Sequence, residues 1–292
     1  MKRWILLREQ TVKDIADDFP VAAELARSYF AGAPKPTLSE LIPLFLRGRS
    51  SRGKDALYDT AWILLYLAAS LMDDLQDGEI ESNQENVASV QILSVVAASR
   101  VGRLSYPRNT KTESVIRKAL VGQLLSLENN CSYSQILQSA AQKNALLELP
   151  ISRELGAGAE NASIVEALQI AVQCMDDLTD VFADSRRGAT TTISCREYQG
   201  MSDSEILAKV VKCGRLADLL RLIQKNADSF KNELASFEGD RTPLYHFLSA
   251  IVYATDDLLK LENEVSMAIG GPELEQNIAK LKQRIEVYAI GS

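Results

Sequence analysis

The sequence predicts an all-α protein, and three observations lead to this prediction. Only eight prolines and 15 glycines interrupt a chain of 292 residues, so long stretches can remain helical. Apolar residues make up 46% of the chain and recur at helical spacing. Neither an alternation of strands and helices nor a glycine-rich phosphate-binding loop can be found. We therefore expect one domain over residues 1–292, a bundle of about ten helices.

The first expected helix, Thr11–Phe30, has apolar residues on one side, namely Ile15, Phe19, Ala22, Leu25, Ala26 and Tyr29. The next segment, Ala31–Thr37, contains a glycine and two prolines and is expected to be a loop. A short helix is expected at Ser39–Arg47, followed by a long one at Asp55–Asp77. Gly78 is expected to end the long helix because glycine tolerates left-handed backbone.

The rest of the chain continues the helical pattern. Turns or loops are expected at Tyr106–Asn109, at the threonine-rich segment Ser185–Glu197 and at Gly270–Pro272, with a break near Gly214. The expected helices are Asn86–Leu104, Lys111–Asn129, Ser132–Gly156, Ser163–Ala183, Ser202–Leu234, Pro243–Ala268 and Glu273–Ile290.

The pattern DDLxD occurs twice, each time at the end of a long apolar run. The first acidic motif is Asp73-Asp74-Leu75-Gln76-Asp77, and the second is Asp176-Asp177-Leu178-Thr179-Asp180. Residues four apart share a face of a helix, so the first and last aspartate of each motif should point the same way. Clustered carboxylates repel each other unless a cation lies among them, and Mg²⁺ prefers oxygen ligands that it shares with phosphates. Two such motifs facing each other would bind a diphosphate through metal ions.

The alternative interpretation is that both motifs are solvated helix ends, because acidic helix surfaces are common. Repetition at the ends of two apolar helices favours the metal site. The net charge of −7 argues against a nucleic-acid partner, and an acidic protein needs metal to hold an anionic diphosphate. The four cysteines are far apart and predict neither a zinc site nor a disulfide framework.

A cytoplasmic location is the default expectation from the sequence. The start, Met1–Arg8, has too short an apolar core for a signal peptide. We also expect no transmembrane segment, since no apolar run approaches the length of a membrane span.

The two motifs and their surroundings resemble the trans-isoprenyl diphosphate synthases, the polyprenyl synthetase family within the class I isoprenoid (terpenoid) synthases. The resemblance covers roughly Asp55 to Asp184 and is weaker elsewhere. Further matches are Gly122-Gln123 for the family's GQ, Lys143 for its KT lysine, Gly156-Ala157 for its GA, and Gln173 for the glutamine before its second motif. The resemblance implies an isoprenoid-synthase-type helical bundle with a central cavity, Mg²⁺ as cofactor and a homodimer.

The resemblance also implies roles for individual residues. It implies Asp73, Asp77 and Asp176 as metal ligands, with assistance from Asp74, Asp177 and Asp180. Lys143 and Arg187 would contact diphosphate, and Gln173 would be a neutral polar group near the carbocation. Lys143 as a solvated lysine, and Arg186 and Arg187 as residues capping a helix end, remain alternatives.

The chain departs from the family at three places, which together imply that its site for isopentenyl diphosphate is lost. The family's paired arginines after the first motif are absent, since Gly78–Asn86 reads GEIESNQEN. Its GGKRxRP pattern is also missing, and the nearest basic segment is Arg47–Lys54, either a solvated loop or a site for an anionic acceptor. After the second motif only Ser185–Gly188 (SRRG) stands in place of the family's lysines. This pattern is similar to atypical members such as the moenomycin-pathway prenyltransferase, which uses an allylic diphosphate with a different acceptor.

We therefore expect a Mg²⁺-dependent prenyltransferase that ionises an allylic diphosphate of farnesyl length or longer and transfers the prenyl group to an unknown acceptor. In the family that the chain resembles, the residues four and five before the first aspartate line the pocket for the prenyl tail. Here they are the small Ala69 and Ala68, which implies the long tail, with Leu65, Tyr66 and Trp62 as a deeper floor. A class I terpene cyclase, a chain elongator with a rebuilt isopentenyl diphosphate site and a non-catalytic partner subunit remain alternatives. Asp256-Asp257 is expected to be a polar helix face rather than a third metal motif, and His246 is expected to be structural rather than catalytic.

Overall fold

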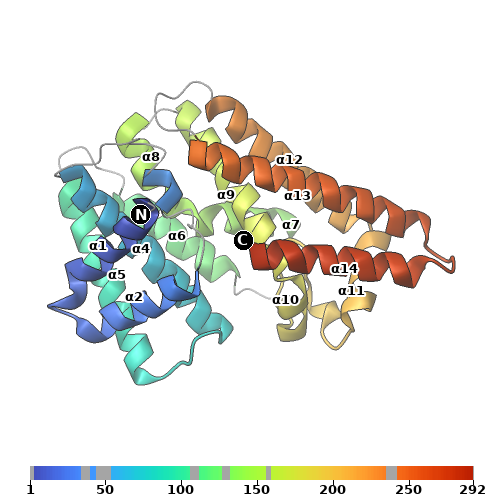
Figure 1. Cartoon of the computed structure of the whole chain (residues 1–292), viewed down its shortest axis with the longest axis horizontal. Helices are drawn as coiled ribbons and strands as arrows, with labels where there is room; N and C mark the ends of the chain where they lie inside the picture. Colours follow the sequence, from blue (N-terminus) through green and yellow to red (C-terminus); the bar gives the residue numbers. More distant parts are fainter. Residues whose placement is uncertain are drawn as a thin grey trace. The chain divides into compact units, whose positions relative to one another are not determined.

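The computed structural model describes residues 3–33, 40–43, 54–105, 112–126, 132–155, 159–234 and 242–291. All regular secondary structure in these ranges is helical, which confirms the predicted all-α class (Figure 1). The chain divides into two compact units. Unit 1 comprises Met1–Val115, Leu146–Gly158 and Glu238–Leu244, and unit 2 comprises Ile116–Ala145, Ala159–Phe237 and Tyr245–Ser292. The expectation of a single domain stays a prediction.

Unit 1 is built around a pair of long helices, α4 and α5, which pack against each other. Helices α1 and α2 cover this pair, with α1 on α4 and α2 on α5. The bounds in this unit are α1 Arg3–Ala16, α2 Pro20–Gly32, α4 Lys54–Asp77, α5 Gln84–Ser105 and α8 Glu148–Leu155. The largest buried side chain is Trp62, which is fully buried and donates from Nε1 to the carbonyl of Leu146 at 3.0 Å.

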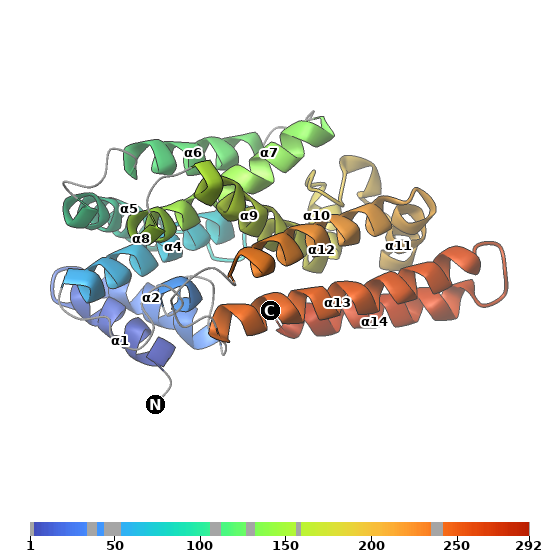
Figure 2. The ribbon, with the colours of Figure 1, turned by 90° about the horizontal axis from the view of Figure 1, so that it is seen from above.

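Unit 2 is organised around α9, which packs against α7, α10, α12 and α14. Figure 2 shows α13 and α14 as neighbouring antiparallel helices, and a hydrogen bond of 2.8 Å joins Tyr288 to Asp257 across them. The bounds are α6 Thr112–Ser126 (which starts in unit 1), α7 Tyr133–Lys143, η1 Ala145–Leu147 (which leads into unit 1), α9 Ala159–Thr179, α10 Val181–Arg187, η2 Arg196–Tyr198, α11 Asp203–Lys212, α12 Arg215–Glu233, α13 Thr242–Met267 and α14 Leu274–Gly291.

Several expected helices are divided in the structure, so the described residues hold more than the about ten helices expected. The expected helix Thr11–Phe30 is interrupted before Pro20, which lacks an amide hydrogen and begins α2. The expected helix Ser132–Gly156 changes to a 3₁₀ turn after Asn144, and the expected helix Ser163–Ala183 is interrupted at Asp180. The predicted break at Gly214 is confirmed, since this residue separates α11 from α12.

One described helix differs from the expectation about membrane spans. Residues Gln84–Leu104 of α5 are long and apolar enough to cross a membrane, and 28% of an 18-residue stretch within them is buried. Core helices of soluble proteins can have the same length and composition, so this helix is weak evidence for a membrane span. The expectation that the chain has no transmembrane segment therefore stays a prediction.

Candidate functional site

The first acidic motif ends α4 in unit 1. Asp73 and Asp74 are half-buried, whereas the side chain of Asp77 lies outside the described residues. Gly78 follows with φ of +74°, which confirms the expected left-handed residue at this helix end. The chain then turns back, because the amides of Glu79 and Ile80 donate to the carbonyl of Asp74 at 2.8 and 3.2 Å. The motif therefore occupies the terminal turn of the helix.

The second acidic motif ends α9 in unit 2, and its three aspartates differ in burial. Asp176 is exposed, Asp177 is buried with 8% exposure, and Asp180 is half-buried at the junction with α10. The amide of Asp180 donates to the carbonyl of Asp176 at 3.0 Å, so the helical turn continues across the junction. Asp176 and Asp180 therefore follow each other by one turn, as the spacing predicts.

Gln173 connects the second motif to α7. Its Nε2 donates to Asp177 Oδ1 at 2.9 Å and to Asp176 Oδ2 at 3.2 Å. Its Oε1 accepts a hydrogen bond of 2.9 Å from Asn144 Nδ2. Because Asn144 occupies the carbonyl side of this amide, the NH₂ side faces the two carboxylates. The structure thus brings Gln173 together with Asp176 and Asp177, two of the residues that the sequence predicts for the site.

The other oxygen of Asp177 binds the segment after α10. Thr192 donates to Asp177 Oδ2 twice, from its backbone amide at 2.9 Å and from Oγ1 at 2.6 Å. Thr192 is fully buried, and Arg215 of α12 donates from Nε to the Thr192 carbonyl at 3.1 Å. The same guanidinium donates from Nη2 to the Thr191 carbonyl at 3.2 Å. Sequence reasoning did not single out Thr192 or Arg215, since only the threonine-rich run hinted at this contact.

Lys143 is the last residue of α7 and is half-buried. Its backbone lies against Gly122 of α6, where a Cβ atom would be 2.4 Å from the Lys143 nitrogen. Ser139 Oγ also donates to the Gly122 carbonyl at 2.8 Å. The close approach of α6 and α7 therefore requires glycine at position 122 and fixes the end of α7, next to Asn144.

The two arginines of the SRRG segment form ion pairs with aspartates. Arg187 Nη2 lies 2.7 Å from Asp184 Oδ1, and Arg186 Nη1 lies 3.1 Å from Asp203 Oδ1 of α11. Burial raises the pKa of Asp184 to about 7, although the hydrogen bond from Arg187 lowers it. Arg187, expected to contact diphosphate, thus already has a carboxylate partner within its own helix.

Burial also raises the pKa of the Cys174 thiol, with the nearby Asp177 carboxylate adding to the effect. Cys174 therefore stays protonated and lies among the apolar residues of α9. The other described cysteines, Cys195 and Cys213, are also free thiols.

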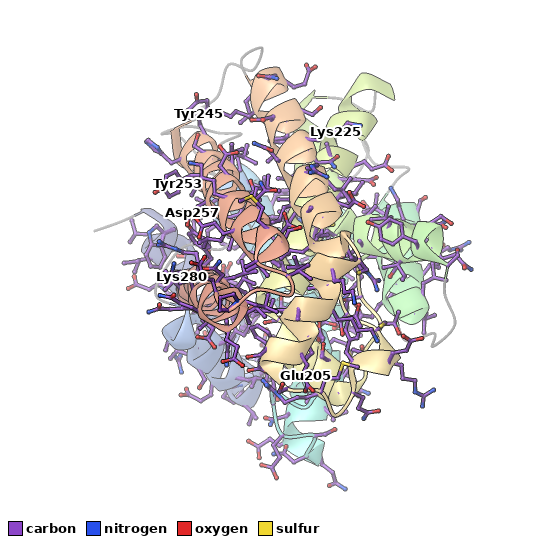
Figure 3. The ribbon with its side chains drawn as sticks, turned by 90° about the vertical axis from the view of Figure 1, so that its right-hand side faces the viewer. Glu205, Lys225, Tyr245, Tyr253, Asp257 and Lys280 are labelled. Atoms are coloured by element: carbon purple, nitrogen blue, oxygen red, sulfur yellow. The ribbon has the colours of Figure 1, made fainter. Side chains whose placement is uncertain are left out.

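The late Asp256-Asp257 pair contacts neighbouring side chains on α12 and α14. Asp257, labelled on α13 in Figure 3, lies 3.0 Å from Arg284 Nε and accepts the hydrogen bond from Tyr288. Asp256 accepts a hydrogen bond of 2.6 Å from Gln224. His246 is exposed on the same helix. These contacts agree with the expectation that the pair is a polar helix face.

Some predicted features lie outside the described residues. They are Gly156-Ala157, the basic segment from Arg47 to Gly53 and the side chains of Lys54 and Asp77. Within the described ranges, no group of three or more His, Cys, Asp or Glu residues is arranged to hold a metal ion. The side chain of Asp77 lies outside the described residues, and the two motifs belong to different units. The metal ligands therefore stay a prediction. Comparison of the chain with protein-family models, with curated proteins and with solved structures gives no match.

Proposed function

We propose that the protein is a Mg²⁺-dependent prenyltransferase that ionises an allylic diphosphate. The observation that carries this proposal is the position of the two acidic motifs at the C-terminal ends of α4 and α9. Helix α4 has no basic residue in its last turn, although the negative end of a helix dipole favours cations there. Adding aspartates to such an end is unfavourable without a bound cation, and the oxygen donors fit a hard divalent ion.

In this proposal Asp73, Asp77 and Asp176 hold Mg²⁺ with help from Asp74 and Asp180. When bound, Mg²⁺ neutralises the charge that develops on the departing diphosphate. Lys143 at the end of α7 contributes a further positive charge. Arg187 would have to exchange its partner Asp184 for the diphosphate, and it is therefore the weaker of the two predicted contacts.

The reaction breaks the bond between the allylic carbon and the diphosphate oxygen, and the electron pair leaves with the oxygen. The acceptor then forms a bond to the allylic carbon and loses a proton. Positioning of the acceptor and exclusion of water decide which product forms. Gln173 suits a position near the carbocation because its amide is neutral and reacts less readily with a carbocation than an amine does. The hydrogen bond from Asn144 already orients this amide.

The test is an assay of the purified protein with Mg²⁺ and geranyl, farnesyl and geranylgeranyl diphosphate. Diphosphate release is measured, and products are identified by mass with and without isopentenyl diphosphate. Release from an allylic diphosphate that disappears on chelation is expected. Absence of Mg²⁺-dependent release from all three substrates would contradict the proposal and favour a non-catalytic partner subunit.

Replacing Asp73 and Asp77 together by Asn should abolish turnover. The double variant should keep or slightly raise the free energy of unfolding, because removing neighbouring like charges relieves repulsion. The matched control is Asp17→Asn with Asp18→Asn, two exposed aspartates of the turn between α1 and α2. A double Asp73/Asp77 variant with normal activity would contradict the metal assignment.

A further inference from the structure

The contacts at the end of α9 give one aspartate of the second motif a role different from that of its neighbours. Asp177 is a buried carboxylate that accepts three hydrogen bonds, from Gln173 Nε2, Thr192 N and Thr192 Oγ1. A buried charge is costly unless such donors compensate it. Turning Asp177 toward a metal ion would leave the buried Thr192 amide without this acceptor. Asp177 is therefore expected to keep its hydrogen bonds to Gln173 and Thr192 instead of binding a metal ion.

The segment that binds Asp177 is itself fixed on several sides. The Thr191 amide donates to the Ser194 carbonyl at 3.1 Å, and the Ser194 amide donates to Thr191 Oγ1 at 3.0 Å. The hydroxyls of Ser185 and Ser194, both buried, lie 3.0 Å apart. Together with the two hydrogen bonds from Arg215, these contacts make a closed turn that ties α9, α10 and α12 together.

Arg215 and Asp177 act on opposite sides of the same turn. The guanidinium donates to the carbonyls of Thr191 and Thr192, while the carboxylate accepts from the amide and hydroxyl of Thr192. Hydrogen bonds in such a chain polarise one another, and those to charged groups are the stronger ones. The turn is thus hydrogen-bonded both to the Arg215 guanidinium and to the Asp177 carboxylate.

We propose that Asp177, Thr192 and Arg215 are positioning residues, which set Asp176 and Asp180 in place for Mg²⁺ in the proposed prenyltransferase. This inference rests on the proposed function. Asp177 would influence the position of Asp176 through Gln173, whose Nε2 donates to both carboxylates. It would influence Asp180 through the backbone, because Asp180 lies between α9 and α10, and both helices are tied to the turn.

The test compares Thr192→Val with Thr192→Ser in the full chain. Valine keeps the shape of threonine and loses the hydroxyl, whereas serine keeps the hydroxyl. Diphosphate release is measured against Mg²⁺ concentration at saturating allylic diphosphate, together with the melting temperature. Because residues that orient metal ligands typically change metal affinity by about 10-fold or more, we expect the half-saturating Mg²⁺ concentration of Thr192→Val to rise about tenfold. Its kcat at saturating Mg²⁺ should change much less, and Thr192→Ser should match the wild type.

Replacement of a proposed ligand gives the contrasting result. Asp176→Asn should lower kcat at every Mg²⁺ concentration. If Thr192→Val does not fold, Arg215→Lys replaces it, since lysine cannot donate to both carbonyls in the same geometry. Wild-type Mg²⁺ dependence in the folded variant, or equal impairment in Thr192→Ser and Thr192→Val, would overturn the proposal.

A second measurement separates failure of this inference from failure of the proposed function. Amide hydrogen exchange of residues 189–195 is followed in the wild type, Thr192→Val and Asp177→Asn. Faster exchange in both variants supports the turn's dependence on Asp177 even if the wild type shows no activity, and unchanged exchange overturns it. An active wild type with unchanged exchange in the variants would leave the prenyltransferase proposal standing and remove the positioning residues.

Discussion

Asp184 is a buried carboxyl group whose ionised form is poorly accommodated by its surroundings. Its side chain lies near Arg187, which donates a hydrogen bond of 2.7 Å, yet burial raises its pKa to about 7. The negative charges of Asp177 and Asp180 raise the pKa further, and Arg187 lowers it. The ordinary value is 3.8, so the folded state binds the proton more tightly than the unfolded state.

This shift predicts a pH dependence of stability. Between about pH 4 and pH 7 the folded protein carries more protons at Asp184 than the unfolded chain, so the free energy of unfolding should fall as pH rises. The slope from this group should be on the order of 1 kcal/mol per pH unit at most. Asp184→Asn should remove this contribution to the slope, as measured by urea unfolding at pH 5 and pH 8 in the presence of a chelator.

The control for this measurement is Asp18→Asn, because Asp18 is exposed in the turn before α2. If Asp184→Asn lost as much stability between pH 5 and pH 8 as the wild type, the raised pKa would be wrong.

The environment of Asp184 could not be predicted from the sequence, where Asp184 only follows Asp180 by one turn. The same holds for Thr192, because its contact with Asp177 depends on the path of the chain through α10 rather than on periodicity.

At the scale of elements, the crossing of α6 and α7 depends on Gly122. A Cβ atom at this position would lie 2.4 Å from the Lys143 nitrogen and 2.6 Å from Gln142 Cβ. Backbone atoms cannot move aside as a flexible side chain can. We therefore expect Gly122→Ala to lower the free energy of unfolding by about 1–3 kcal/mol, despite the better helix propensity of alanine.

Gly102 on α5 provides the matched control for Gly122. A Cβ atom at Gly102 would meet nothing within 4 Å, so Gly102→Ala should stabilise the protein by about 0.5–1 kcal/mol. Urea unfolding of both variants gives the comparison. Equal effects of the two substitutions would show that α6 and α7 do not approach as closely as described. Gly122→Ala should also lower the proposed prenyltransferase activity, because Lys143 and Asn144 would shift.

The face of α4 before the first acidic motif is expected to line the pocket for the prenyl tail. Ala69 is exposed in unit 1, whereas Ala68 and Leu65 are buried. Trp62 and Tyr66 have ring centroids 5.7 Å apart, and the Trp62 indole is hydrogen-bonded in the core. An added ring at position 69 therefore need not disturb the packing of this unit, which makes Ala69 the residue to test.

Ala69→Phe should prevent turnover of farnesyl and longer diphosphates while sparing geranyl diphosphate, because added volume in an apolar pocket shortens the tail that fits. The kcat/KM for each substrate length is the measurement. Ala88→Phe, an exposed alanine on α5, is the control and should leave the length preference unchanged. An unchanged preference in Ala69→Phe would show that this helix face is not the tail pocket.

Helix existence was more predictable than helix boundaries. The apolar periodicity of α4, α9 and α12 is sustained over many residues and predicts each of them near its observed range. No proline or glycine lies near the interruption at Asp180, whereas Pro150 in the first turn of α8 is a local signal for the break after Asn144. Asn144 also has a tertiary contact, since it binds Gln173. Asp180 links α9 and α10, and Asp177 of α9 binds Thr192 in the turn that follows α10.

At the scale of the whole molecule, the two compact units each carry one acidic motif. The sequence predicts that the motifs act together, because repetition of an uncommon pattern is visible without a structure. The segment after the first motif differs from the one after the second. Glu79, Glu81 and Glu85 follow the first motif and are all exposed, while Arg186 and Arg187 follow the second.

This difference predicts that isopentenyl diphosphate is not the natural acceptor. Its diphosphate would approach three exposed glutamates at the place where the family that the chain resembles has paired arginines. No lysine or arginine lies between Gly78 and Asn86 to offset their negative charge. Repulsion between charges within the screening distance of about 8 Å should keep its half-saturating concentration high.

With farnesyl diphosphate and isopentenyl diphosphate together, product masses should show little elongation. Glu79→Arg combined with Glu81→Arg should lower the half-saturating concentration, whereas Glu275→Arg on α14 should not. Efficient elongation by the wild type at ordinary concentrations would contradict the prediction and would direct attention to the basic segment Arg47–Lys54 as the replacement site.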